Sequence, residues 1–360
     1  MTPAHVNETP TPQQGPSEGA QPDRQSQIEW DRSKLPWGAE VWERIDKAVE
    51  LEIKGTRIGA RFLPEKAVPP KTASVPADSY TTAARPNPIL TVADDVTTPL
   101  NEYYVEFELT ARQVRQEESE FRRLGHSTAV TLATKAANTL AQAEDLIVFQ
   151  GANAIRHANL FTSSLALHRG SPADTGLLNQ GIHPAPVGQS AIVGPLSPPI
   201  TVIRVARLAP SVPGVLYGPN TFDAVSRAYS FLHAAGHCGP YALVLQTTPY
   251  ADTFAPLGAM PALTADRIKP LATAGFFGTG TLPPNPLPPA PRPALPVPPG
   301  PPFFGVLVSV GGNTADLVRG LDPMVVFMGE DPNGNFRFRV AERFALRVKD
   351  TTAIIVFRFD

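Results

Sequence analysis

The distribution of proline constrains this chain more than any other feature of its sequence. The 360 residues include 41 prolines. A proline inside a helix removes a backbone hydrogen bond, and a proline in a central strand removes a bond between strands. Most of the prolines lie in four stretches, 1–34, 63–100, 152–217 and 281–302. Regular structure is therefore expected mainly between these stretches.

Two helices are predicted in the first half of the chain. Residues 1–34 are poor in aliphatic side chains, so we expect a disordered tail. Apolar residues then recur at helical spacing and predict an N-terminal helix over 35–54, ended by Gly55. Ser127 is a suitable N-cap for a long alanine-rich helix that runs to Gln150. At about 1.5 Å per residue, this second helix is more than ~30 Å long.

Strands dominate the end of the chain. Residues 101–109 alternate in polarity and predict a strand. After a further helix over 222–235, apolar or alternating stretches predict strands over 241–245, 304–310, 316–327, 336–346 and 352–359. Asn333-Gly334 is typical of a tight hairpin turn. Residues 63–100 show no helical period, and an extended arm that pairs with another chain explains them better than a long loop. The pattern indicates an α+β protein.

Composition excludes several classes of protein. The formal net charge is −2, which argues against a protein that packs naked nucleic acid. The single cysteine, Cys238, excludes an intrachain disulfide and a cysteine-rich metal site. The sequence has neither the apolar core of a signal peptide nor a run of about 18 apolar residues. A cytoplasmic protein without a membrane span is therefore expected.

Several stretches resemble the encapsulins, a family of bacterial and archaeal shell proteins. The most specific is the Gly-Pro-Tyr turn at 239–241, which leads into a core strand. The others are an acidic pair followed by an apolar run and Gly in 143–151, Gly-Leu-Leu-Asn in 176–179, Trp-Glu-Arg-Ile-Asp in 42–46, and the strands of 316–359. These stretches occur in the family's order and together span residues 36–360 with gaps.

The resemblance implies the tailed-bacteriophage major capsid (Hong-Kong-97-like) fold, with a peripheral domain, an axial domain and an extended arm. On this basis the predicted organisation is a tail at 1–34, the N-terminal helix at 35–54, the arm at 55–100, the peripheral domain with the long helix at 101–217, the axial domain with its proline-rich insert (281–302) at 218–310, and strands returning to the peripheral domain at 311–360.

The implied function is a self-assembling icosahedral nanocompartment that encloses cargo enzymes and controls small-molecule access through pores. Its implied partners are many copies of itself and a cargo enzyme that carries a short targeting peptide. The alternative is a phage or prophage capsid protein that packages DNA, although the net charge makes nucleic acid an unlikely partner. Deletion of the tail is expected to leave assembly intact, and the proline-rich insert is expected to be exposed.

The resemblance also suggests functional residues. Candidates for cargo docking are Trp42, Ile45, Val49 and Ile58, with Asp322 as a polar edge. The alternative is that the first three pack the helix onto its own subunit. Candidates for a pore loop are Phe254, Leu257 and Met260, with an ordinary surface loop as the alternative. Arg112 stands where some relatives have a flavin-binding aromatic residue, so no cofactor is expected.

Catalytic candidates are weak. Ser127 lies in a degenerate nucleophile motif, but the segment before it is charged and helical, which favours a helix cap. His237 and Cys238 are adjacent, whereas catalytic pairs usually converge from distant segments. A hydrolase using Ser127 or Cys238 is a third, weaker hypothesis, and no metal site is expected. The sequence predicts a structural protein rather than an enzyme.

Overall fold

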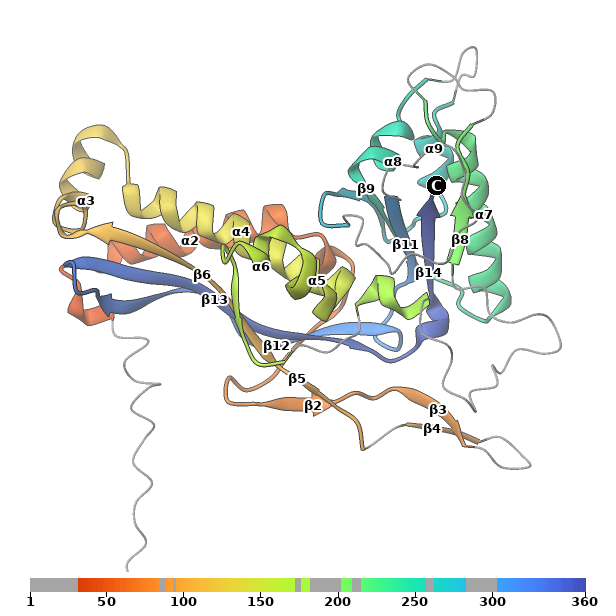
Figure 1. Cartoon of the computed structure of the whole chain (residues 1–360), viewed down its shortest axis with the longest axis horizontal. Helices are drawn as coiled ribbons and strands as arrows, with labels where there is room; N and C mark the ends of the chain where they lie inside the picture. Colours follow the sequence, from red (N-terminus) through yellow and green to blue (C-terminus); the bar gives the residue numbers. More distant parts are fainter. Residues whose placement is uncertain are drawn as a thin grey trace, which may run out of the picture.

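The computed structural model describes residues 32–83, 89–92, 95–171, 176–181, 202–208, 215–256, 262–282 and 303–360. Within these residues the chain forms two five-stranded sheets and a pair of small two-stranded sheets (Figure 1). The predicted tail, apart from its last three residues, and residues 283–302 of the proline-rich insert lie outside the described residues.

The first sheet contains the longest strands. Its order is β1 (Glu65–Ala67), β12 (Ala315–Glu330), β13 (Asn335–Val348), β6 (Asn101–Thr110) and β7 (Leu167–Arg169). β12 and β13 form an antiparallel hairpin, and its turn ends at Gly334 with a positive φ of 79°. Only glycine adopts this conformation without strain. The predicted strands at 101–109, 316–327 and 336–346 and the hairpin between the last two are confirmed.

Helices α2 (Ala39–Thr56), α3 (Ala111–Leu124) and α4 (Thr128–Gln150) lie along one face of the first sheet (Figure 1). The Oγ atom of Ser127 accepts the amide of Val130 and caps α4, as the sequence predicted. Two short helices follow α4, α5 (Ala152–His157) and α6 (Asn159–Thr162). Both long helices predicted from the first half of the chain are therefore confirmed.

The Gly-Leu-Leu-Asn stretch at residues 176–179 has a role in packing. It begins the short 3-10 helix η3 (Leu177–Gly181), which packs against the end of α4. A Cβ atom on Gly176 would lie 2.4 Å from the backbone nitrogen of Gly151. Asn179 donates from Nδ2 to the carbonyl of Gln150 at 2.9 Å. A larger residue than glycine would push η3 away from the helix end.

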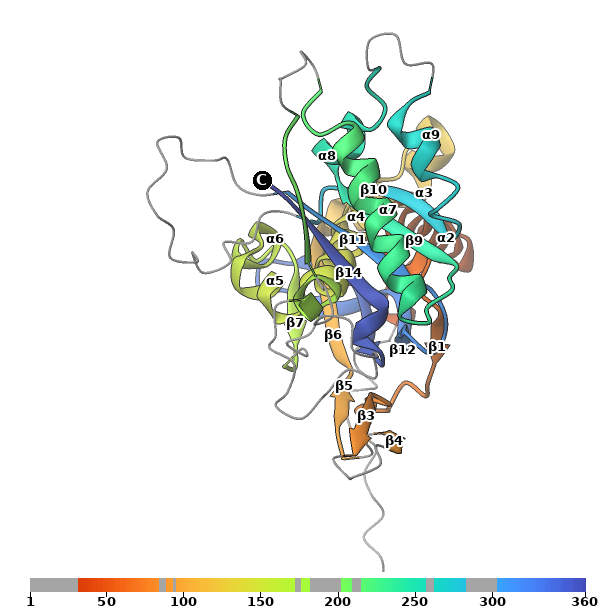
Figure 2. The same cartoon turned by 90° about the vertical axis from the view of Figure 1, so that its right-hand side faces the viewer.

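The second sheet has the order β10 (Gly275–Thr279), β9 (Tyr241–Gln246), β11 (Phe303–Ser309), β14 (Ile354–Phe359) and β8 (Val202–Val205). Helix α7 (Pro219–Ala234) packs against it, and the short helices α8 (Thr247–Asp252) and α9 (Thr264–Ile268) flank it (Figure 2). The predicted helix at 222–235 and the predicted strands at 241–245, 304–310 and 352–359 are confirmed. Short 3-10 turns occur at η1 (Arg32–Lys34), η2 (Gly59–Arg61) and η4 (Thr351–Ala353).

Two strands lie in a different unit from the one that the sequence predicted. Residues 311–360 were expected to return together to the peripheral domain, but β14 pairs with β11 and β8 of the second sheet. β8 itself falls in the segment 101–217 that was assigned to the peripheral domain. The reason is burial: residues 354–357 are apolar and buried without alternation, which suits a central strand covered on both faces.

The described parts of residues 74–99 form an extended arm. β2 (Ser74–Pro76) pairs with β5 (Thr97–Pro99), and β3 (Tyr80–Ala83) pairs with β4 (Ile89–Val92). The β3–β4 pair projects away from both large sheets in two perpendicular views (Figures 1 and 2). Residues 55–61, which were also assigned to the arm, contain instead the end of α2 and η2. The pairing of the arm with another chain stays a prediction. Among the described residues, no helix has the length and apolar character needed to cross a membrane.

Candidate functional site

The residues predicted to dock cargo do not form one surface. Ile45 and Val49 are each 1% exposed and Trp42 is 7% exposed. They lie on the face of α2 that packs against α4 and the first sheet. This burial favours the alternative that the three side chains pack the helix onto their own subunit, and their role in docking stays a prediction. Helical periodicity finds a buried stripe but does not tell a self-covered stripe from a binding stripe.

The chain itself covers Trp42. The ring of Trp37 meets that of Trp42 edge-on at 5.1 Å and stacks on Phe338 at 5.4 Å. The guanidinium of Arg32 lies 4.4 Å from the ring of Trp42 and donates to the carboxylate of Asp46. Residues just before α2 thus cover the ring of Trp42, on which a cargo peptide was predicted to dock.

The two remaining docking candidates lie in separate features. Asp322 is exposed on β12, within the register shift between Leu321 and Met324 in the pairing with β13. Ile58 is partly buried and lines a pocket beyond the end of α2. The structure describes their environments and leaves their predicted role in docking as a prediction.

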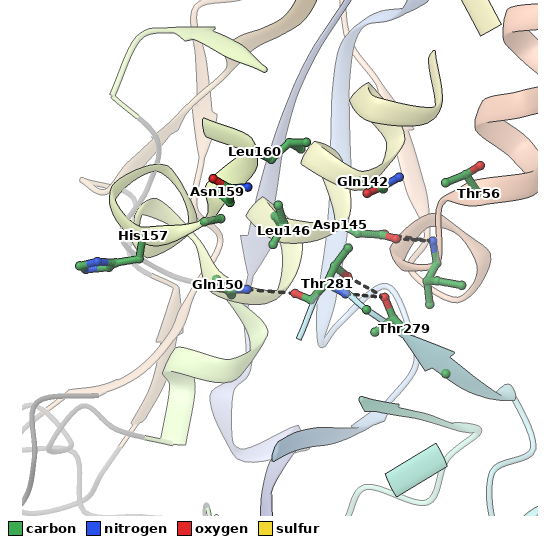
Figure 3. A pocket seen from close by; sticks show the side chains of 14 residues that line it. Thr56, Gln142, Asp145, Leu146, Gln150, His157, Asn159, Leu160, Thr279 and Thr281 are labelled. Carbon is green, nitrogen blue, oxygen red and sulfur yellow. Dashed lines mark hydrogen bonds between the residues drawn. The ribbon is translucent and has the colours of Figure 1, made fainter. Parts of the chain in front are cut away.

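The pocket has a volume of about 610 Å³ and lies where α4, α5 and α6 face the end of β10 (Figure 3). Its polar lining residues are Thr56, Gln142, Asp145, Gln150, His157, Asn159, Thr279 and Thr281, and its apolar ones include Ile58, Leu146 and Leu160. Gln150 donates from Nε2 to the carbonyl of Thr281 at 2.9 Å and so links α4 to the second sheet. Pockets of this volume can hold a small molecule or a few side chains.

Asp145 is the buried carboxylate of this pocket. Its oxygens accept the amides of Ile58 and Gly59 at 2.8–3.0 Å. A Cβ atom on Gly59 would lie 3.0 Å from Val148, so the glycine allows η2 to approach α4 closely. Burial raises the pKa of Asp145 to about 7, although the two amides act in the opposite direction. This side chain therefore changes charge near neutral pH.

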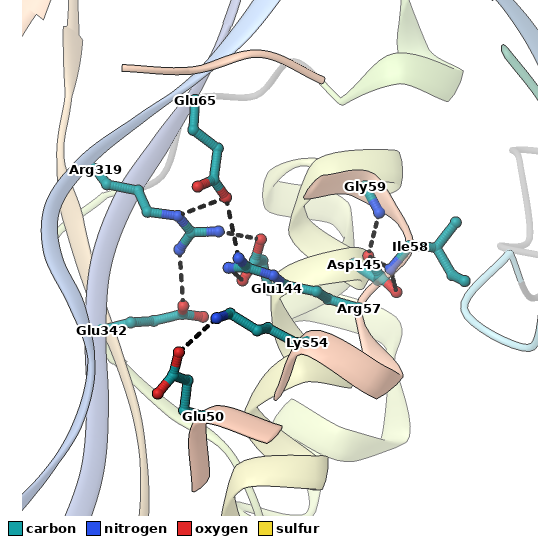
Figure 4. Close-up of polar contacts among 10 residues, drawn as sticks. All are labelled: Glu50, Lys54, Arg57, Ile58, Gly59, Glu65, Glu144, Asp145, Arg319 and Glu342. Atoms are coloured by element: carbon teal, nitrogen blue, oxygen red, sulfur yellow. Dashed lines mark hydrogen bonds and ion pairs between the residues drawn. The ribbon is translucent and has the colours of Figure 1, made fainter. Parts of the chain in front are cut away.

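A cluster of charged side chains, of which Glu144, Arg319 and Glu342 are buried, lies next to Asp145 (Figure 4). We call it the charge cluster; its members are Arg57, Glu65, Glu144, Arg319 and Glu342. Arg319 donates to Glu144 at 2.6 Å, to Glu65 at 2.9 Å and to Glu342 at 3.1 Å. Arg57 lies 3.3 Å from Glu65 and 3.7 Å from Glu144. The cluster joins α4, β1, β12 and β13 to the segment that follows α2.

Sequence reasoning missed this cluster as a unit. It noted the acidic pair Glu144-Asp145 inside an apolar run, which is an unusual place for two carboxylates. Arg319 and Glu342 also sit inside strands rather than in turns. A search for charged residues within buried elements would have found these members, but their convergence depends on the pairing of β12 with β13.

One predicted pore residue is described. Phe254 is 38% exposed, and its ring lies 5.1 Å from that of Tyr250 and 6.3 Å from that of Phe276. Lys269 lies 5.7 Å from the same ring. Leu257 and Met260 lie outside the described residues. The pore role of all three stays a prediction.

The catalytic candidates have structural roles. Ser127 caps α4 and donates to Glu117, a buried carboxylate that also accepts the amide of Ala129 at 3.2 Å. His237 contacts Thr352 at 2.9 Å, and Cys238 is exposed. Across the described parts of the chain, no group of three or more His, Cys, Asp or Glu residues is arranged to hold a metal ion.

Comparison with known structures identifies the class of fold. A virus-like particle from Pyrococcus furiosus superposes with a TM-score of 0.57 at 16% identity, over 89% of this chain and 100% of that chain. Mycobacterium phage Ogopogo superposes with a TM-score of 0.52 at 15% identity, over 85% of this chain and 92% of that one. The fold is that of the tailed-phage capsid proteins, as predicted.

Sequence comparison narrows the class. Residues 29–182 match the family model Linocin_M18, described as an encapsulating protein for peroxidase. The type 1 encapsulin shell protein EncA of Myxococcus xanthus (strain DK1622) is 29% identical over 133 residues, which are 37% of this chain and 40% of that protein. The resemblance to the encapsulins is therefore confirmed, and it is carried by the first half of the chain. The match spans less than half of the curated relative.

Proposed function

We propose that this chain is a self-assembling shell protein that encloses cargo in a closed compartment and limits the passage of small molecules. Support comes from the capsid fold over most of the chain and from the encapsulin match over residues 29–182. The relative from M. xanthus is itself named as a shell protein. No catalytic step is part of the proposal.

The observation that carries the proposal is the projecting arm. Among the described residues, β3 and β4 form a sheet of two strands that is separate from both large sheets. Val92 and Val96 on the arm are 43% and 49% exposed. An exposed two-stranded ribbon is marginally stable alone and exposes edges that invite pairing with another chain. Another copy of this chain would cover the arm in a closed symmetric assembly.

Hydrogen bonds fix the base of the arm to the end of the first sheet. The amide of Tyr80 donates to the carbonyl of Lys349 at 3.0 Å. Arg347 donates to the carboxylate of Asp78 and, at 3.2 Å, to the carbonyl of Pro76. The chain outside the arm thus orients the arm without covering it.

Cargo capture and pore control are the finer parts of the proposal. Because Trp42, Ile45 and Val49 are buried, a targeting peptide would have to use exposed positions, of which Ile58 and Asp322 are the remaining candidates. Phe254, Leu257 and Met260 remain the proposed pore residues. A cytoplasmic location also remains a prediction.

Electron microscopy of the purified full chain tests the proposal, together with absorbance at 260 and 280 nm. Uniform closed particles that lack nucleic acid are expected. Particles filled with DNA would support the alternative of a capsid that packages a genome. A small species of uniform size would contradict shell formation.

A variant without the β3–β4 pair sharpens this test. Replacing residues 80–92 with a short Gly-Ser linker should abolish closed particles but leave the circular dichroism spectrum of the body unchanged. The matched control replaces Val92 and Val96 with threonine, which keeps the ribbon and reduces its apolar surface. Closed particles from the deletion variant would show that the arm is not the assembly element.

A further inference from the structure

The charge cluster places two fully buried carboxyl groups on one guanidinium group. Glu144 and Glu342 are fully buried, and both accept hydrogen bonds from Arg319. Glu65, the third carboxylate on Arg319, is exposed to solvent, and Arg57 lies near Glu144. Two ionised carboxylates that share one buried site repel each other, which favours the protonated form of one of them.

Two oxygen atoms of this cluster have no hydrogen-bond donor. Glu342 Oε1 and Glu144 Oε2 are buried and accept no hydrogen bond within the described structure. The nearest cation to Glu144 Oε2 is Arg57, at 3.7 Å, beyond hydrogen-bonding distance. A proton on Glu342 would provide a donor and would also remove the repulsion between two buried carboxylates.

We propose that Glu342 is protonated in the folded chain and donates its proton to Glu144, and that loss of this proton as pH rises loosens the joint between β1 and the rest of the first sheet. The pKa of Glu342 supports this: burial raises it most, and the charge of Glu144 and a hydrogen bond to its carboxyl group raise it further, against the lowering effect of Arg319 and Arg57. The inference concerns the folded chain and does not depend on the proposed function.

Other titratable groups face the pair. Asp145, the next residue on α4, also has a raised pKa, and its carboxylate is held by the amides of η2 with Arg61 nearby. On β6, Tyr103 stands opposite Glu342 in the strand register. Burial and the charge of Glu342 raise the pKa of this tyrosine, which keeps it neutral, so it adds no negative charge to the cluster. The proton on Glu342 is the one that relieves the repulsion between the two glutamates.

The mechanical consequence follows from the position of β1. This strand is short, exposed and at the edge of the first sheet, where it pairs with β12 over three residues. It carries Glu65 and leads into the arm. When the pair loses its proton, Glu65 faces an added negative charge across Arg319, and the most weakly held strand is expected to separate first.

The sign of the pH effect is defined. The pKa of Glu342 in the folded chain lies well above its ordinary value of 4.5. Folding therefore retains a proton between these two values, and stability is lost as pH rises through this window. This loss of stability should be visible as a falling melting temperature and as faster amide exchange of Leu317 and Val68, which bond across the β1–β12 edge.

Glu342→Gln is the test variant, since its amide reproduces the neutral, hydrogen-donating form. Thermal unfolding of the full chain, in the same assembly state, should show a smaller loss of melting temperature with rising pH than in the wild type, by the equivalent of about one proton. Exchange at Leu317 and Val68, corrected for intrinsic rates, should no longer accelerate. Glu108→Gln is the matched control because Glu108 pairs with Arg337 in a strand at the surface.

Equal pH dependence in the wild type and Glu342→Gln would overturn the proposal. Should this variant fail to fold, infrared spectroscopy of the wild type keeps the proposal open to refutation. In an Asp145→Asn background, a carbonyl band of a protonated carboxyl group should persist above the ordinary glutamate value of 4.5 and disappear as pH rises through the raised pKa of Glu342. Absence of that band would show that the pair is fully ionised.

Discussion

The two large sheets are stabilised in different ways. The interior of the first sheet contains charged side chains, among them Glu144, Arg319, Glu342, Asp316 and Arg347. Arg347 and Asp316 form a second buried pair at 2.6 Å. In contrast, the core of the second sheet consists of aliphatic and aromatic side chains packed under α7.

The two interiors differ in how strictly they fix the positions of the elements around them. Apolar packing is tolerant: a core accepts other side chains of similar volume at small cost. Buried ion pairs have demanding geometry, and removing one partner leaves an unpaired charge. The first sheet joins α2, α4 and the base of the arm, so a fixed relative position of these parts fits its ionic interior. The second sheet needs only a filled core.

Asp252 is an instructive exception in the second unit. Its carboxylate accepts the amides of Leu216, Tyr217 and Gly218 at 2.6–2.9 Å. These amides lie just before α7. A buried charge is thus present here too, but it is balanced by backbone donors instead of by arginine.

The largest expected effect contrasts matched apolar substitutions in the two units. Arg319→Met should lower the free energy of unfolding by about 3–5 kcal/mol, because it leaves the carboxylates of Glu144 and Glu342 without their cation. Leu243→Met, in the core of the second sheet, should cost less than about 1.5 kcal/mol. Urea unfolding of both variants measures the contrast.

Arg337→Met is the control for surface charge, since Arg337 pairs with Glu108 at the exposed end of the first sheet. Little change is expected there. Similar losses for Arg319→Met and Leu243→Met would remove the distinction between the two interiors.

A smaller effect is expected at the exception. Asp252→Asn replaces one acceptor oxygen with an amide that faces backbone N–H donors, so the variant should lose about 1–3 kcal/mol of stability. The loss should appear first as faster amide exchange of Leu216 to Gly218. An unchanged exchange rate at these amides would mean that the carboxylate does not hold the segment before α7.

The smallest effect concerns pH. The pKa of Asp145 is raised to about 7, so ionisation of this carboxyl group opposes folding. The free energy of unfolding therefore falls as pH rises from the ordinary pKa of an aspartate to the raised one. Asp145→Asn keeps an acceptor for the two amides and removes the charge. Between about pH 6 and about pH 8, the wild type should lose roughly 1 kcal/mol more stability than the variant. Parallel pH profiles would contradict the raised pKa.

Much of the secondary structure could be predicted, because its signals are local. Ser127 as a cap, the alanine-rich run to Gln150 and the turn at Asn333-Gly334 each act through neighbours in the chain. The capsid fold was also predictable from short stretches in a characteristic order. The burial of Ile45 and Val49 by their own chain could not be predicted. These residues show the same helical period whether their own chain or a partner covers them.

The sequence by itself therefore determined the long helices and the longest strands, since periodicity, caps and turns depend on residues a few positions apart. Only the tertiary structure decided that β14 completes the second sheet and that Glu144, Arg319 and Glu342 meet in one cluster. Those residues are separated by up to 198 positions, and no local preference encodes their distance. Their contact arises from the register of β12 and β13 beneath α4, and the burial that follows controls their charge.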